Sequence, residues 1–211
     1  MEPGVLFVSF AVLLFSLTVH EAAHAWTAAR LGDPTARLLG RVSLNPVVHV
    51  DPVGTLLLPA VALATGAPLI GWAKPVPVST ARLGRYPRDF VLVAAAGPAS
   101  NVALALVASV ALRLVPQRAV GLAGLEVSEP LMALAFAAFQ VNLLLAVFNL
   151  VPVPPLDGGN ILGGLLRGRL SQGYEALRPW GVFLLYALML SGALAYIIGP
   201  PYYLLARLLT L

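Results

Sequence analysis

Long apolar stretches without charge constrain this chain more than any other feature of its sequence. Residues 5–19 carry no charged side chain, and apolar runs also cover residues 53–70, 90–115, 131–151 and 180–198. A helix of about 20 apolar residues crosses the hydrocarbon core of a bilayer. With 59% hydrophobic residues and a mean hydropathy of +0.89, the chain is too apolar for an ordinary soluble domain. We expect an all-α polytopic membrane protein, built as a single integral-membrane unit over residues 1–211.

The apolar runs differ in continuity. Gly54, Pro59 and Gly66 interrupt the run over residues 53–70, and such breaks favour a segment that enters the bilayer and returns. The other runs, with the first counted over residues 4–29, predict four spanning helices plus this re-entrant segment. Residues 74–79 have the extended character of a short hairpin at the membrane surface, although a plain surface loop explains them equally well. Residues 199–211 are too short to assign.

Two of the three histidines of the chain lie in one pentapeptide of the first run, residues 20–24. A helix places His20 and His24 on one face, where their imidazoles can bind one metal ion, with Glu21 beside them as a general base. This spacing is typical of zinc hydrolases. The alternative is that both histidines are packing residues and that the short pattern arose by chance.

A catalytic zinc site commonly needs a third protein ligand. The chain has no cysteine, so this ligand must be His, Asp or Glu. Asp157 is the best candidate, because Pro152, Pro154 and Pro155 break the preceding helix and irregular backbone at membrane depth needs a buried or hydrated cavity. The same residues also favour a simple surface turn. His49 is either a spare ligand or a local hydrogen-bonding residue.

The topology decides whether Asp157 can reach the histidines. If residues 53–70 crossed completely, Asp157 would emerge on the side opposite His24, whereas a re-entrant segment puts both at one depth. The re-entrant topology also collects ten basic residues and all three tryptophans at one boundary, which the positive-inside rule makes cytoplasmic. These residues are Arg30, Arg37, Arg41, Lys74, Arg82, Arg85, Arg88, Arg167, Arg169 and Arg178, with Trp26, Trp72 and Trp180. We expect the active site toward the cytoplasmic side of a prokaryotic plasma membrane.

Several ordered motifs resemble those of the site-2 protease family, the intramembrane zinc metalloproteases of peptidase family M50, in its compact form. They are His20-Glu21-Ala22-Ala23-His24, Asn45-Pro46 with Asp51-Pro52-Val53-Gly54, Gly71-Trp72-Ala73-Lys74-Pro75-Val76-Pro77-Val78, Gly97-Pro98-Ala99-Ser100-Asn101, and Phe148-Asn149-Leu150-Val151-Pro152 running into Pro155-Leu156-Asp157-Gly158-Gly159. The resemblance implies that His20, His24 and Asp157 bind Zn²⁺ and that Glu21 is the catalytic acid and base. It also implies a role for Asn149, and more weakly Asn101, toward substrate or oxyanion. The sequence departs from the pattern of other family members in three respects. We find no helix before the one with His20, no PDZ-like domain and no nucleotide-binding domain.

The expected activity is that of a zinc-dependent endopeptidase, which hydrolyses peptide bonds in or near transmembrane segments of membrane proteins. No motif for nucleic acid is present. The main alternative is a metal-ion transporter or channel that uses the same His and Asp groups, and a further one is a non-catalytic membrane scaffold. Other intramembrane proteases fit poorly, because no second aspartate lies in a span to pair with Asp157 and no histidine accompanies Ser191.

Overall fold

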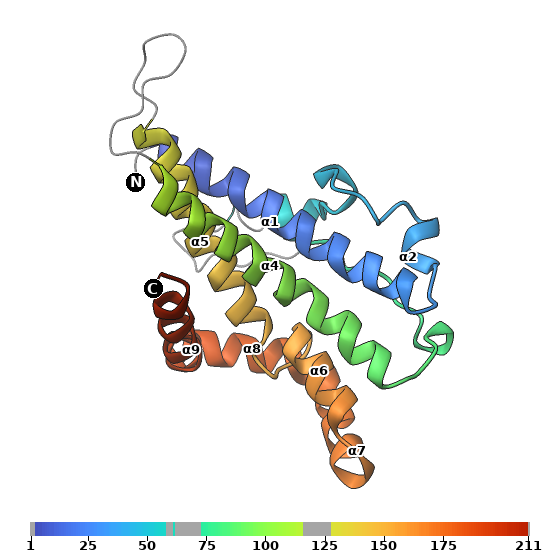
Figure 1. Cartoon of the computed structure of the whole chain (residues 1–211). Helices are drawn as coiled ribbons and strands as arrows, with labels where there is room; N and C mark the ends of the chain where they lie inside the picture. Colours follow the sequence, from blue (N-terminus) through green and yellow to red (C-terminus); the bar gives the residue numbers. More distant parts are fainter. Residues whose placement is uncertain (1–2, 58–60, 62–72, 116–127, 211) are drawn as a thin grey trace.

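The computed structural model describes residues 3–57, 61, 73–115 and 128–210, and all regular secondary structure in these ranges is helical (Figure 1). The longest helices are α1 (Pro3–Arg30), α4 (Arg88–Leu114) and α5 (Ser128–Asn149). The shorter ones are α2 (Thr35–Leu38), η1 (Pro46–Val48), η2 (Pro52–Leu57), η3 (Thr80–Arg82), α6 (Asp157–Leu165), α7 (Gly168–Leu177), η4 (Arg178–Trp180), α8 (Gly181–Leu190) and α9 (Ala193–Thr210).

Helices α1, α4 and α5 form the centre of the molecule, and α4 packs against both of the others (Figure 1). All three are long and apolar enough to cross a membrane, which confirms three of the four expected spans by length and composition. Small side chains fill their interfaces, among them Ala25 and Ala28 of α1 and Ala94, Gly97 and Ala105 of α4. In lipid, small residues let helix backbones approach closely, so packing rather than burial from water holds such helices together.

The surface of the bundle is apolar, and its interior holds polar side chains beside the apolar core. Large apolar side chains face outward, such as Phe7 on α1, Val107 on α4 and Phe136 on α5. Polar side chains lie inside, including Ser16, Thr18, His20, His24, Asn101, Ser109 and Asn142. This distribution is expected for helices in hydrocarbon, where polar groups must find partners within the protein.

The fourth expected span, residues 180–198, is not one straight helix. Helix α8 ends at Leu190, α9 begins at Ala193, and the two segments are bent by 83°. Gly192 adopts a φ of 75°, a conformation open to glycine, and this turns the chain between the two helices. Helix α9 then continues to Thr210, so most of residues 199–211 are helical. Counted together, the bent segments would supply a fourth span.

Helices α1 and α4 run antiparallel, because His24 contacts Val93 near the start of α4 whereas His20 contacts Asn101 further along it. The chain between them therefore leaves and returns at the same end of the bundle. The expected re-entrant segment, residues 53–70, falls mostly on residues 58–60 and 62–70, which lie outside the described ranges, so it remains a prediction.

Residues 74–79, expected as part of an extended hairpin, are not assigned as a strand. Buried polar groups hold this segment against the loop that follows α1. The carboxylate of Asp33 accepts a hydrogen bond from the Ser79 amide at 2.6 Å, and the Lys74 amide donates to the His49 carbonyl at 2.8 Å. The buried Arg41 donates to the carbonyls of Val48, Lys74 and Pro75. Residues 74–79 thus form a loop that hydrogen bonds hold against the loop following α1.

Candidate metal centre

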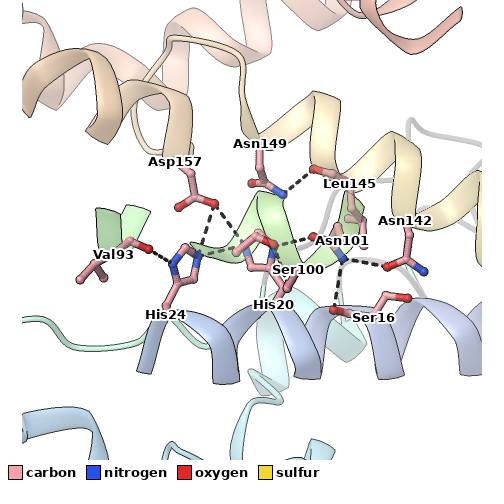
Figure 2. A network of polar contacts seen from close by, with 11 residues as sticks. Ser16, His20, His24, Val93, Ser100, Asn101, Asn142, Leu145, Asn149 and Asp157 are labelled. Atoms are coloured by element: carbon pink, nitrogen blue, oxygen red, sulfur yellow. Dashed lines mark hydrogen bonds and ion pairs between the residues drawn. The ribbon is translucent and has the colours of Figure 1, made fainter. Parts of the chain in front are cut away.

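His20 and His24 lie one turn apart on α1 and direct their Nε2 atoms to the same point, 3.1 Å from each other (Figure 2). Asp157, the first residue of α6, meets them there. Its Oδ2 lies 3.1 Å from Nε2 of His20 and 3.4 Å from Nε2 of His24. The structure thus brings Asp157 to two histidines that precede it by more than 130 residues in the sequence.

The break between α5 and α6 delivers Asp157 to this depth. The prolines that follow α5 prevent the helix from continuing. The chain then folds back so tightly that a Cβ on Gly158 would lie 2.2 Å from the Leu150 carbonyl oxygen. Only glycine fits such an approach. The buried side chains of Val151, Val153 and Leu156 pack with Leu194 of α9 and hold the break in place.

The other nitrogen of each imidazole has an acceptor oxygen within hydrogen-bond distance. Nδ1 of His24 lies 2.7 Å from the Val93 carbonyl, and Nδ1 of His20 lies 2.6 Å from Oδ1 of Asn101. Oxygen acceptors at these positions require Nδ1 to carry the proton. Both Nε2 atoms therefore present a lone pair toward Asp157, as metal-binding histidines do.

Three acceptor atoms that face one another fit a cation. Oδ2 of Asp157 is buried and has no hydrogen-bond donor among the described residues. Ligands of a tetrahedral zinc ion at about 2.0–2.1 Å lie about 3.3–3.4 Å apart, close to the three separations seen here. Among the described residues, His20, His24 and Asp157 form the group whose ligand atoms lie close enough together to hold a metal ion.

Gly97 of α4 leaves room for the two imidazoles. A Cβ at this position would lie 2.3 Å from Nε2 of His24 and 2.6 Å from Nε2 of His20. No side chain can occupy that space, so α4 passes the histidines with bare backbone.

The remaining predicted site residues lie at different places. Glu21 follows His20 on α1, is half-buried, and makes no hydrogen bond or ion pair to any residue that the structure describes. Asn149, at the end of α5, lies next to Asp157 in Figure 2, with its amide donating to the Leu145 carbonyl at 3.0 Å. Asn101 lies behind His20, fully buried, against the nitrogen that faces away from Asp157. His49 is outside the cluster and contacts the Ser43 carbonyl at 2.9 Å.

Sequence reasoning missed Asn142 of α5, which contacts Asn101. Its signal was present, because a buried amide in the apolar run 131–151 needs a partner within the protein.

Comparisons with known proteins identify the family of the chain. The family model "Peptidase family M50" matches residues 119–191, the part that contains Asp157. YwhC of Bacillus subtilis, named as a zinc metalloprotease, is 37% identical over 190 residues, which cover 89% of this chain and 82% of that protein. Rip2 of Mycobacterium tuberculosis, named likewise, is 34% identical over 204 residues, covering 95% of this chain and 74% of the relative. No solved structure matches the chain significantly. The chain belongs to peptidase family M50.

Proposed function

We propose that this chain is an intramembrane zinc metalloprotease that cleaves membrane proteins in or near their transmembrane segments, with His20, His24 and Asp157 as the zinc ligands and Glu21 as the general base. The family and its relatives named as zinc metalloproteases support the class of enzyme. Nothing in these comparisons supports a metal-ion transporter. We place the whole activity in a single domain over residues 1–211.

The observation that carries the proposal is the triangle of three acceptor atoms inside the bundle, Nε2 of His20, Nε2 of His24 and Oδ2 of Asp157. Zinc bound there would lower the pKa of water and polarise a peptide carbonyl. His24 lies six residues before the end of α1, which at 1.5 Å per residue is about 9 Å inside that end. A hydrolytic site at this depth meets a substrate inside the membrane boundary rather than in solution.

Glu21 is placed for proton transfer because it is one turn from His24 on α1 and its carboxylate is not held by a described partner. We assign it the removal of a proton from the attacking water and the delivery of that proton to the leaving amine. Asn149 has one amide hydrogen in its bond to Leu145 and one left over. That hydrogen can stabilise negative charge on the carbonyl oxygen of the substrate.

The basic residues support a cytoplasmic position for the site in a plasma membrane. The end of α1, the start of α4 and the end of α6 lie together, since Gly164 of α6 closely approaches Pro87 and Val91. Arg30, Arg88 and Arg167 therefore lie at one end of the bundle. An excess of Arg and Lys at one boundary marks the cytoplasmic face.

The test is proteolysis with three forms of the purified full chain, each incubated with a panel of single-span membrane proteins, and the cuts mapped by mass spectrometry. The wild-type protein should cleave and lose activity with a chelator. Glu21→Gln should keep bound zinc and lose cleavage, whereas Asp157→Asn should lose both. Full cleavage by Glu21→Gln would refute the general base, and full zinc occupancy in Asp157→Asn would refute the metal site.

A further inference from the structure

Two buried amides connect the candidate metal centre to α5. Nδ2 of Asn101 donates to Oδ1 of Asn142 at 2.9 Å and more weakly to the Ser16 carbonyl at 3.5 Å (Figure 2). Nδ2 of Asn142 donates in turn to the Ala138 carbonyl at 2.9 Å. Asn101, Asn142 and His20 have exposed fractions of 0%, 2% and 4%, so water does not compete for these bonds.

The direction of each hydrogen bond in this series follows from the bond at α5. The Ala138 carbonyl can only accept, so it takes the NH₂ group of Asn142 and turns Oδ1 of Asn142 toward Asn101. Asn101 must then present its own NH₂ group to Asn142, which leaves its Oδ1 for Nδ1 of His20. The proton of His20 is thereby held on Nδ1, and the lone pair of Nε2 faces Asp157.

His20 and His24 differ in the kind of acceptor that holds the proton on Nδ1. Nδ1 of His24 faces a backbone carbonyl, which cannot turn over. Nδ1 of His20 faces a side-chain amide, and rotating the amide of Asn101 by 180° would offer NH₂ instead of oxygen. His20 would then carry its proton on Nε2, and a protonated Nε2 has no lone pair with which to bind a metal. His20 therefore depends on whatever holds Asn101 in its present orientation.

We infer that Asn142 is a positioning residue of the zinc site, which fixes the proton of His20 on Nδ1 by orienting the amide of Asn101. This inference rests on the proposed role of His20 as a zinc ligand. It also gives Asn101 a positioning role in place of direct contact with substrate or oxyanion.

The experiment measures zinc affinity by competition with a chelator, using the purified full chain. Asn142→Leu has a similar size but offers no acceptor, and it should weaken zinc binding about 10-fold, at the lower end of what loss of an outer hydrogen bond costs a metal site. Adding Asn101→Asp to Asn142→Leu should restore most of the loss. Both oxygens of a carboxylate accept, so His20 keeps its proton on Nδ1 whichever way the group turns.

A control variant and a substitute variant separate an effect on orientation from an effect on folding. Ser109→Ala removes another buried hydrogen bond of α4, to the Leu209 carbonyl far from the metal centre, and should lower thermal stability without changing zinc affinity. If Asn142→Leu does not fold, Asn142→Ala carries the same prediction. The tautomer is also readable in the metal-free wild-type protein from ¹⁵N chemical shifts of its three histidines.

The outcomes are distinct. Wild-type zinc affinity in Asn142→Leu, alongside loss of zinc in Asp157→Asn, would overturn the role of Asn142 and leave the metal site standing. Full zinc binding in Asp157→Asn would overturn both. A His20 ring in the metal-free wild-type protein that carries no proton on Nδ1 would also overturn the inference.

Discussion

A single methyl group added at Gly97 should remove the metal from the site. In Gly97→Ala, the new Cβ would lie 2.3 Å from Nε2 of His24 and 2.6 Å from Nε2 of His20, whereas ordinary van der Waals contact begins at 3.4 Å. The imidazoles must therefore retreat by about 1 Å, several times the tolerance of about 0.2 Å for a metal–ligand distance. Neither ring moves freely, because bonds of 2.6 and 2.7 Å hold their Nδ1 atoms.

We expect Gly97→Ala to lose bound zinc and to cleave at least about 100-fold more slowly, as a misplacement of 1 Å does in other active sites. The strain should also lower the free energy of unfolding by about 1–3 kcal/mol. Zinc content by elemental analysis, cleavage rate and thermal unfolding measure the three effects. Gly173→Ala on α7 is the matched control, because a Cβ there meets nothing within 4 Å. A Gly97→Ala protein with wild-type zinc content and cleavage rate would refute the geometry.

Three further predictions concern the loops and the metal. Burial by itself would raise the pKa of Asp33, but hydrogen bonds from Thr35 and Ser79 outweigh it and hold the pKa below its ordinary value of 3.8. The stabilisation from Asp33 should therefore be complete above pH 3.8 and be lost as the pH falls through the lowered pKa, and thermal melts of Asp33→Asn should lack this pH dependence. Arg41→Leu should lower the free energy of unfolding by about 1–3 kcal/mol, since buried carbonyls lose their donor, while zinc affinity stays unchanged; unchanged thermal stability would contradict this. A chelator should lower the melting temperature of the wild-type protein but not of Asp157→Asn, because a ligand stabilises only a fold that binds it.

Much of this protein could be predicted from local patterns of sequence. The apolar runs predicted α1, α4 and α5, because the length of hydrocarbon that a helix must cross is a property of the run itself. The spacing of His20 and His24 predicted a shared face, since helical geometry alone brings residues four apart together. The bend at Gly192 was missed, because hydropathy reports how apolar a run is and not where its backbone turns.

Only the tertiary structure decided which distant groups meet. The sequence offers Asp157 as a ligand or as part of a turn, and its approach to within 3.1 Å of His20 depends on how the proline break packs against α9. The position of Asn101 behind His20, the contact of Asn142 with Asn101 and the bare backbone at Gly97 depend on the register in which α1, α4 and α5 pack. That register follows from contacts among many small side chains across the whole interface, which no local pattern contains.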